Sequence, residues 1–392
     1  MISVEQAKKI LSENSERGQI KEIALGECLG LVLSENIYSP IDVPSFDNSA
    51  MDGYAMNFEG HNEEWEVSNV IQAGDTSETI ISPGKAARIF TGAKIPKGAN
   101  TVIPQELIEV IKEGQIAYSG DKISIGSNIR LKGSQSEKHT QILEKGQVLG
   151  AGQIGLLASV GVAKVKVWTT PRVGYIVTGN ELKEPGTPLR EGEIYNSNGP
   201  MLEALLKENG VKQIQGYKAS DDKNSLQKII DRALSENDIL LLSGGISVGD
   251  YDFVEDCLKT AKVRELFYKI KQRPGKPLFV GKKEKKMVFA LPGNPASVHS
   301  CFIQYVRPSI RFWLGKNAVW DADHQLTLAE DVEKKPGLTY FMKGKKTGGE
   351  VSLLKGQQSF NLQAFATAEC LLELPGENEV VTAGTIVNVY DL

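Results

Sequence analysis

Several short segments combine glycine or proline turns with charged side chains directly after apolar runs. The richest of them is LLSGGISVGDYDF (241–253). The backbone N–H groups of its Ser-Gly-Gly turn, and of the helix expected to follow, form a cradle suited to a phosphate group. We expect Asp250 either to cap that helix or to contact the substrate, and Asp252 to bind Mg²⁺ opposite the phosphates. The segment matches neither GxxxxGK(S/T) nor GxGxxG, which argues against an ATPase or a Rossmann dinucleotide site.

Three further segments supply charge and a rigid backbone. VTGNEL (177–182) places Glu181 just after an apolar run, and RPGKPLF (273–279) contains two cations that can neutralise an anion. In LPGNPAS (291–297), two prolines fix a loop before a helix. Each segment also has a purely structural interpretation, as a polar loop or a rigid turn.

An acidic segment lies much earlier in the chain. PSFDNSAMDGYAM (44–56) is dense in turn-forming residues and contains Asp52 within an Asp-Gly pair. The pair is either an ordinary turn or a means of placing Asp52 in a cleft as a metal ligand or an acid–base group.

The later segments are positioned by an alternation of apolar strands and helices that begins near Thr169. This alternation of strands and helices predicts an open, mostly parallel α/β sheet. The carboxyl ends of parallel strands meet at one edge, so the four loops should converge there on a phosphate-bearing substrate and a divalent cation. The predicted strands are 172–177, 238–242 and 287–291, and the predicted helices are 198–209, 225–235, 253–261 and 296–306.

The flanking regions have other patterns. The chain begins with an amphipathic helix in which Ser3 and Gln6 can form a capping box. Residues 41–136 show short β-rich runs between turns, at 64–71, 86–90 and 101–106, and predict a mostly β unit. Beyond Gly315, five short strands predict a small β domain.

Composition excludes several classes of protein. The 392 residues carry 45 Lys+Arg against 49 Asp+Glu, and this net charge of −4 argues against nucleic acid as the main ligand. No apolar run reaches the length of a membrane span, and the N-terminus lacks a signal-peptide core, so we expect a cytoplasmic protein that does not bind a membrane. The four cysteines form no CxxC pair and the four histidines no HExxH, so buried reduced thiols are expected rather than a zinc site or disulfides.

Seven motifs, in order, resemble one family closely. They are DVPSFDNSAMDGYAM, RIFTGAKIPKGANTVIPQE, TGNEL, YNSNGPML, SGGISVGDYDF, RPGKP and ALPGNPAS, and they span nearly the whole chain. Together they resemble the molybdopterin molybdenumtransferases of the MoeA type, a family that includes the C-terminal domain of gephyrin. The resemblance implies an elongated homodimer with a multidomain α/β plus β fold.

The resemblance also implies a division into four units. A discontinuous N-terminal domain for linkage and dimerisation comprises residues 1–40 and 140–168, and a β-rich domain (41–139) is inserted into it. Residues 169–314 form the α/β molybdopterin-binding domain, with a mostly parallel sheet, and residues 315–392 form a small β-barrel.

The implied reaction joins molybdate to the dithiolene of molybdopterin. The substrate is adenylylated molybdopterin, whose phosphoanhydride is hydrolysed with release of AMP while Mg²⁺ is present. A molybdopterin adenylyltransferase and the molybdoenzymes that accept the cofactor are the implied transient partners. Asp52, Glu181 and Asp252 are the implied catalytic residues and metal ligands. The implied substrate-binding residues are Thr178, Gly179, Asp221, Ser243, Gly244, Gly245, Asp250, Arg273, Lys276, Pro292, Asn294, Pro295, Arg130 and Lys132.

Two positions depart from the family pattern. Gln135 stands where the family has an acidic residue, and Asn180 replaces a frequent Asp. The loss of two carboxylates weakens a divalent cation site unless Glu137 compensates. Three hypotheses follow: an enzyme that inserts molybdenum, a binding protein that inserts the metal poorly, and a scaffold. For the enzyme, we expect Asp52 of one subunit to face the α/β loops of the other.

Overall fold

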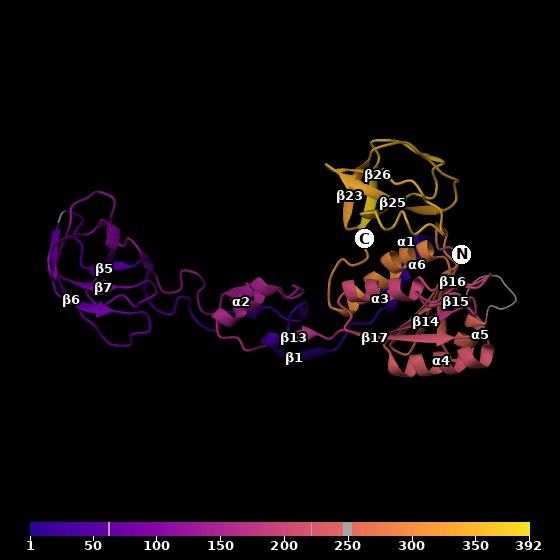
Figure 1. Ribbon diagram of the computed structural model, residues 1–392, viewed down its shortest axis with the longest axis horizontal. Helices are drawn as coiled ribbons and strands as arrows, with labels where there is room; N and C mark the ends of the chain where they lie inside the picture. The colour runs from indigo at the N-terminus through magenta and orange to yellow at the C-terminus, as the bar shows by residue number, and fades with distance from the viewer. Residues whose placement is uncertain (62, 221, 246–252) are drawn as a thin grey trace.

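The computed structural model describes residues 1–61, 63–220, 222–245 and 253–392. The molecule is elongated (Figure 1). An all-β lobe occupies one end, a narrow stalk lies in the middle, and an α/β unit with a small β-barrel forms the other end. The chain runs through the stalk twice, on its way to the lobe and on its way back.

The stalk is built from both passes of the chain. β1 pairs in an antiparallel manner with β13, which also pairs with β2, and β3 pairs with β12. Leu33 of the first pass belongs to one apolar cluster with Leu157 and Val165 of the second, so both passes of the chain contribute to the core of the stalk. Its elements are β1 (Ile20–Ala24), η1 (Leu25–Glu27), β2 (Val32–Leu33), β3 (Ile37–Tyr38), β12 (Gln141–Leu143), α2 (Ala151–Ser159) and β13 (Lys164–Trp168).

The lobe contains a six-stranded sheet in the order β8-β5-β7-β6-β10-β9. Side chains alternate between its two faces. Ala55 and Met56, adjacent in β5, therefore belong to different apolar clusters, and the second of these clusters includes Phe58 and Trp65. The elements are β4 (Asn48–Ser49), β5 (Gly53–Met56), β6 (Glu63–Ile71), β7 (Lys85–Ile89), β8 (Thr101–Pro104), η2 (Gln105–Leu107), β9 (Glu109–Lys112), β10 (Gln115–Tyr118) and β11 (Ile129–Arg130).

The α/β unit has a six-stranded sheet in the order β17-β14-β18-β22-β21-β19. All strands run in the same direction except β21, which is antiparallel to both of its neighbours, β22 and β19, so the predicted mostly parallel sheet is confirmed. The strands are β14 (Arg172–Thr178), β17 (Gln213–Ala219), β18 (Ile239–Ser243), β19 (Arg264–Tyr268), β21 (Phe279–Lys283) and β22 (Lys286–Leu291), with β15 (Leu182–Lys183) paired to β16 (Ile194–Tyr195) beside them.

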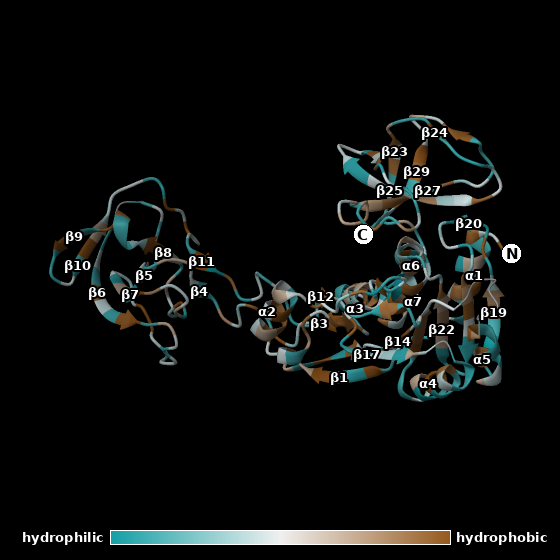
Figure 2. Cartoon of the chain, turned by 45° about the vertical axis from the view of Figure 1, so that its right-hand side comes forward, coloured by the Kyte–Doolittle hydropathy of each residue, from teal (hydrophilic) through white to brown (hydrophobic). Residues whose placement is uncertain are grey.

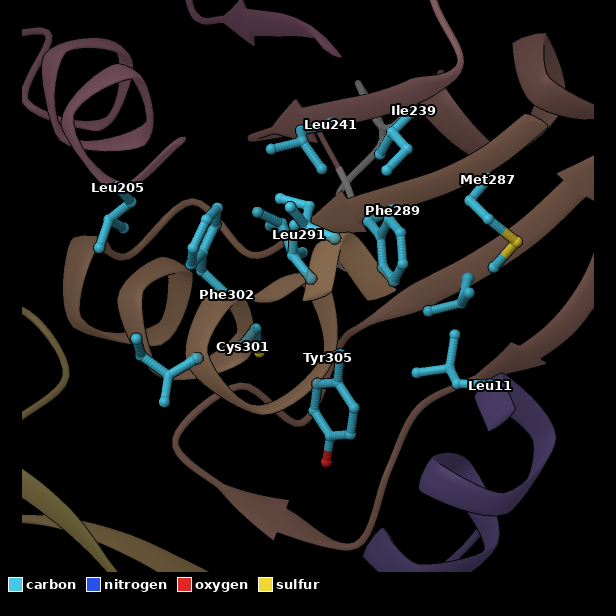
Figure 3. Packing of buried hydrophobic residues seen from close by; sticks show 14 of the residues in the cluster. Leu11, Leu205, Ile239, Leu241, Met287, Phe289, Leu291, Cys301, Phe302 and Tyr305 are labelled. Atoms are coloured by element: carbon cyan, nitrogen blue, oxygen red, sulfur yellow. The ribbon is translucent and has the colours of Figure 1, made fainter. Parts of the chain in front are cut away.

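Helices cover both faces of this sheet because its central strands are apolar on both sides. Leu241 and Phe289 pack against α3, α6 and α7, whereas the neighbouring residues Leu240 and Val288 pack against α4 and α5. Figure 2 shows hydrophobic residues along these strands, and Figure 3 shows the packing of the first cluster. The helices are α3 (Asn198–Glu208), α4 (Lys223–Glu236), α5 (Val254–Thr260), α6 (Pro295–Cys301), η3 (Phe302–Val306, a π-helical turn) and α7 (Arg307–Trp313).

The N-terminal helix α1 (Val4–Asn14) has the predicted capping box: Ser3 Oγ accepts from Gln6 N, and Gln6 Oε1 accepts from Ser3 N. Its buried residues Val4, Ala7 and Leu11 belong to the core of the α/β unit. The domain boundaries drawn from the sequence stay predictions, but this packing differs from the grouping of residues 1–40 as one unit. An amphipathic pattern identifies the buried face of a helix and not the partner of that face.

The C-terminal unit is a five-stranded barrel. β25 pairs with both β26 and β27, and this closes the strand order β25-β26-β23-β29-β27. The five strands predicted from the sequence are therefore confirmed. The elements are β20 (Gln272–Arg273), β23 (His324–Leu328), β24 (Val332–Glu333), β25 (Thr339–Thr347), β26 (Glu350–Leu353), β27 (Cys370–Leu374), β28 (Val380–Val381) and β29 (Ile386–Asp391).

β20 belongs to the α/β unit in sequence but pairs with β25 of the barrel, and it thereby joins the two units. Among the residues that the structure describes, no helix combines the length and apolar character needed to cross a bilayer.

Candidate functional site

A cleft of about 660 Å³ lies at the carboxyl ends of β14, β18 and β22. The four loops predicted to converge do line this one cleft, because parallel strands deliver their following loops to the same edge. The predicted residues that line it are Thr178, Gly179, Glu181, Ser243, Gly244, Gly245, Pro292, Asn294 and Pro295, together with Pro277 of the RPGKP loop.

The Ser-Gly-Gly turn packs directly on the end of β14. Gly244 and Gly245 have φ angles of +91° and +66°, which favour glycine. A Cβ at Gly244 would lie 2.9 Å from both Thr178 O and Thr178 Oγ1, and a Cβ at Gly245 would lie 2.9 Å from Val254 Cγ2. Glycine is therefore required at both positions. Thr178 Oγ1 is buried and has no hydrogen-bond partner within the described residues.

Asn198 ties two of the loops together. Its Nδ2 donates to Ser243 Oγ at 2.9 Å and to Gly293 O at 2.8 Å. Sequence reasoning noted the YNSNGPML motif but assigned Asn198 no role. An asparagine at the start of a helix is indistinguishable in sequence from an ordinary cap.

A second cleft of about 620 Å³ adjoins the first and shares Pro277 and Asn294 with it. It lies between the RPGKP loop and the barrel. Two of its cations, Arg273 and Lys276, were predicted, whereas Lys334 and Lys335 come from the barrel and were missed. In the described part of the chain, none of these four cations forms an ion pair with a carboxylate.

Lys334 is the most buried cation of this second cleft, at 7% exposed. Burial lowers the pKa of its ammonium group below the ordinary value for lysine. Its Nζ lies 5.3 Å from the centre of the Tyr340 ring, and the Arg273 guanidinium lies 5.5 Å from the same ring. Tyr340 thus holds both positive groups by cation–π contacts. These contacts do not neutralise the charge of either group, so both can still bind an anion.

A barrel loop borders both clefts. Ser359 Oγ accepts from Asn294 Nδ2 at 3.3 Å, and Ser359 O accepts from Ala296 N at 3.2 Å. The loop is held from beneath by the buried Lys343, whose Nζ donates to Gly356 O at 2.8 Å and to Gln358 O at 3.3 Å. Because the loop comes from another unit, nothing in the sequence places it here.

The predicted residues Asp52, Arg130 and Lys132 lie on the lobe, which is apart from the clefts (Figure 1). Asp52 Oδ1 accepts from Thr91 N at 2.7 Å and from Thr91 Oγ1 at 2.8 Å, and these bonds lower the pKa of Asp52. Lys132 Nζ pairs with Asp42 at 3.2 Å, and Arg130 lies opposite Asn48 in the β4–β11 pair. A single chain therefore does not bring Asp52, Arg130 or Lys132 to Glu181.

Three predicted residues, Asp221, Asp250 and Asp252, lie outside the described residues. Within the described ranges, no group of three His, Cys, Asp or Glu side chains is arranged to hold a metal ion. Of the predicted metal ligands, the structure describes Glu181 in the first cleft and Asp52 on the lobe.

Comparison with known proteins covers nearly the whole chain. A molybdopterin molybdenumtransferase of Staphylococcus epidermidis is 36% identical over 404 residues, which cover 99% of this chain and 95% of that protein. The chain belongs to the molybdopterin molybdenumtransferase family. The Staphylococcus aureus molybdopterin molybdenumtransferase is 34% identical, covering 98% of this chain and 94% of that protein.

Three family profiles match successive parts of this molybdopterin molybdenumtransferase chain. Residues 2–161 match the MoeA N-terminal region (domain I and II), residues 174–311 match a probable molybdopterin binding domain, and residues 325–392 match the MoeA C-terminal region (domain IV). A crystal structure of a molybdopterin biosynthesis MoeA protein from Pyrococcus horikoshii superposes with a TM-score of 0.83 at 31% identity, covering 100% of this chain and 99% of that one. The family resemblance and the multidomain fold predicted from the sequence are confirmed, and the chain is a transferase of molybdenum cofactor biosynthesis.

Proposed function

We propose that the chain inserts molybdate into adenylylated molybdopterin and releases AMP. The observation that supports this most directly is the pair of adjoining clefts, one lined by glycine and polar groups and the other by four cations that form no ion pair with any carboxylate of the described residues. The first suits a substrate with a phosphoanhydride, and the second suits a doubly negative oxyanion. Their shared wall, at Pro277 and Asn294, lets the two substrates meet.

In the first cleft, the Ser-Gly-Gly turn and Thr178 hold the phosphates by hydrogen bonds. Water adds across the phosphoanhydride, so that the bond between the bridging oxygen and one phosphorus breaks and AMP departs. Glu181, beside Gly179, orients that water and accepts its proton. Asp252 and Asp52 are proposed to share this work.

In the second cleft, Arg273, Lys276, Lys334 and Lys335 hold molybdate by charge. Among the described residues, the buried Lys334 has no carboxylate partner. A bound oxyanion would therefore supply the favourable Coulomb interaction that this ammonium group does not receive from the protein. Binding molybdate beside the pterin also orients it toward the dithiolene sulfurs, which reduces the entropic cost of the transfer.

The active enzyme is proposed to be a homodimer. The lobe presents exposed apolar side chains near Asp52, among them Phe46, Met51 and Leu131, which suit a protein contact. If this surface packs on a second copy, Asp52, Arg130 and Lys132 of one subunit approach the clefts of the other.

Mg²⁺ is proposed as the cation of the reaction. Magnesium is commonly held by one or two carboxylates together with substrate phosphates, so Glu181 and the bound phosphoanhydride are a sufficient donor set. The cation would neutralise charge on the phosphates. The protein is further proposed to act in the cytoplasm, to take its substrate from a molybdopterin adenylyltransferase and to pass its product to molybdoenzymes.

The test is an assay with adenylylated molybdopterin, molybdate and Mg²⁺ that measures AMP and molybdenum-loaded pterin together. The wild-type chain should release both products. The double variant Arg273→Ala/Lys276→Ala should raise the KM for molybdate at least about tenfold, because two charges near the oxyanion are lost. A matched control, Lys283→Ala/Lys285→Ala, removes equal charge from the β21–β22 hairpin and should leave that KM unchanged. Tight pterin binding without turnover would instead identify a binding protein.

A further inference from the structure

The RPGKP loop is held from behind by a buried polar network that no part of the proposed chemistry uses. Arg273 and Lys276 of this loop are exposed, whereas Gln272 is 1% exposed and Tyr305 is fully buried. Gln272 comes just before the loop, and Tyr305 comes from the π-helical turn η3. The two cations therefore face the cleft while the residues behind them face the core.

Both polar atoms of the Gln272 side chain are hydrogen-bonded. Its Nε2 donates to Pro274 O at 3.1 Å and to Gly275 O at 3.2 Å, both within the loop. Its Oε1 accepts from the hydroxyl of Tyr305. Burial raises the pKa of Tyr305 well above its ordinary value, so the hydroxyl remains protonated and is the donor. Tyr305 of the helical segment thus holds the Gln272 amide in place, and the amide in turn holds the RPGKP loop.

The loop also rests directly on this network. Gly275 has a φ angle of +86°, and a Cβ there would lie 2.4 Å from Cys301 Sγ and 2.8 Å from Gln272 Nε2. Figure 3 shows Cys301 and Tyr305 on the same helical segment, with the Tyr305 hydroxyl pointing away from Phe289 and Leu291 of the sheet. The backbone between the two cations has no room to shift toward the core.

The buried network counteracts the electrostatic repulsion between the two cations of the loop. Arg273 and Lys276 carry like charges three residues apart, and without an anion they repel each other. A loop free to relax would separate them and would pay an ordering cost when the anion binds. The network fixes their spacing in advance.

We infer that Gln272 and Tyr305 are positioning residues that hold Arg273 and Lys276 at the spacing an oxyanion requires. The inference rests on the proposed function, because it takes the oxyanion of this loop to be molybdate. The pair touches no substrate and acts only through the loop. Its contribution should therefore be seen in molybdate binding and not in the hydrolytic step.

The experiment compares Tyr305→Phe and Gln272→Met with wild type in steady-state AMP release. Both variants preserve the size of the buried side chain. Each should raise the KM for molybdate about tenfold and leave kcat at saturating molybdate nearly unchanged. Calorimetric titration of the chain with molybdate should show the same loss of affinity. The double variant should be no worse than Gln272→Met, since both changes break one network.

A matched control separates positioning from stability. Tyr217→Phe also removes a buried hydroxyl, which bonds to Glu236 and Asn237 on the other face of the sheet. It should lower the melting temperature without raising the KM for molybdate. A fall in kcat with unchanged KM in Tyr305→Phe would overturn the inference. If the KM for molybdate is unchanged both in Tyr305→Phe and in Arg273→Ala/Lys276→Ala, the proposed function of the loop fails. If Arg273→Ala/Lys276→Ala raises this KM but Tyr305→Phe and Gln272→Met do not, only the positioning role fails.

Discussion

The lobe and the second cleft both carry predicted cations, but they hold charge in opposite ways. On the lobe, Lys132 pairs with Asp42, and Asp52 is bound by Thr91 through two hydrogen bonds. In the cleft, Arg273 and Lys334 both contact the Tyr340 ring, and Lys334 Nζ also donates to Leu338 O at 3.5 Å. Groups already satisfied within the fold have little left to gain from a ligand, whereas uncompensated cations gain the full interaction. The cleft is therefore organised to bind an anion, whereas the lobe already satisfies these charged groups within its own fold.

The largest effect expected from this difference is at Glu181, the one predicted carboxylate that lines the first cleft among the residues that the structure describes. Glu181→Gln should lower the rate of AMP release by about 10²–10⁴-fold, the usual contribution of a general base. Affinity for adenylylated molybdopterin, measured by equilibrium binding, should remain near wild type. The control Glu184→Gln removes a carboxylate that pairs with Lys218 at 2.5 Å and should have little effect. Equal losses in both variants would contradict the assignment.

The next effect concerns whether the lobe reaches the cleft of a second copy. Asp52→Ala and Glu181→Gln chains should each be nearly inactive alone. Mixed after subunit exchange, they should recover about a quarter of wild-type activity, because half of the dimers are mixed and each mixed dimer has one intact site. AMP release is the measurement, and mass spectrometry of the intact dimers verifies exchange. Absence of recovery despite exchange would place both residues in the site of one chain, whereas full activity of Asp52→Ala alone would deny Asp52 a role.

A smaller effect compares the cations of the two regions directly. Lys334→Met should raise the KM for molybdate about tenfold, since an uncompensated, mostly buried charge is lost. Lys132→Met should change it by less than about threefold, because an exposed lysine paired with a carboxylate contributes little. The ratio of the two effects is the informative quantity. Equal effects would mean that internal pairing on the lobe does not decide which cations bind the anion.

The smallest effect concerns the missing carboxylate on the lobe. Gln135 lies in the loop that includes Lys132, with its N–H donating to Val43 O at 2.9 Å. Gln135→Asp should lower the Mg²⁺ concentration for half-maximal AMP release up to about tenfold, or 1–2 kcal/mol, provided that the new carboxylate reaches the cation in a partly solvated site. An unchanged requirement would shift attention to Glu137, and Glu137→Gln is then the variant to measure.

The convergence of the four loops could be predicted from the sequence because it follows from strand direction alone. Glu181 and the Ser-Gly-Gly turn each follow an apolar strand, and parallel strands deliver them to one edge. The contribution of the barrel could not be predicted. Lys334 and Ser359 enter the site through the docking of one unit on another, and no local periodicity reports that contact.

Individual helices and strands also show that tertiary packing limits what the sequence can predict. The predicted helix 296–306 is helical throughout but contains the π turn η3, which places Tyr305 behind the RPGKP loop. Strand β17 was not predicted, because Gly216 and several polar residues interrupt its apolar pattern. Edge strands are exposed and need fewer apolar residues than central ones. In each case local composition was outweighed by tertiary packing.

The double passage of the chain through the stalk has a consequence for how the protein folds. The partners Ile20 and Trp168 in β1 and β13 are separated by roughly 150 residues, so closing this sheet first would carry the entropic cost of a long loop. The lobe brings its own two ends together, with Val43 N bonded to Ser136 O and Ser39 N to Thr140 O. A folded lobe thus shortens the loop that remains to be closed, and each halving of that loop recovers about 0.6 kcal/mol. We therefore expect the lobe to fold before the stalk that carries it.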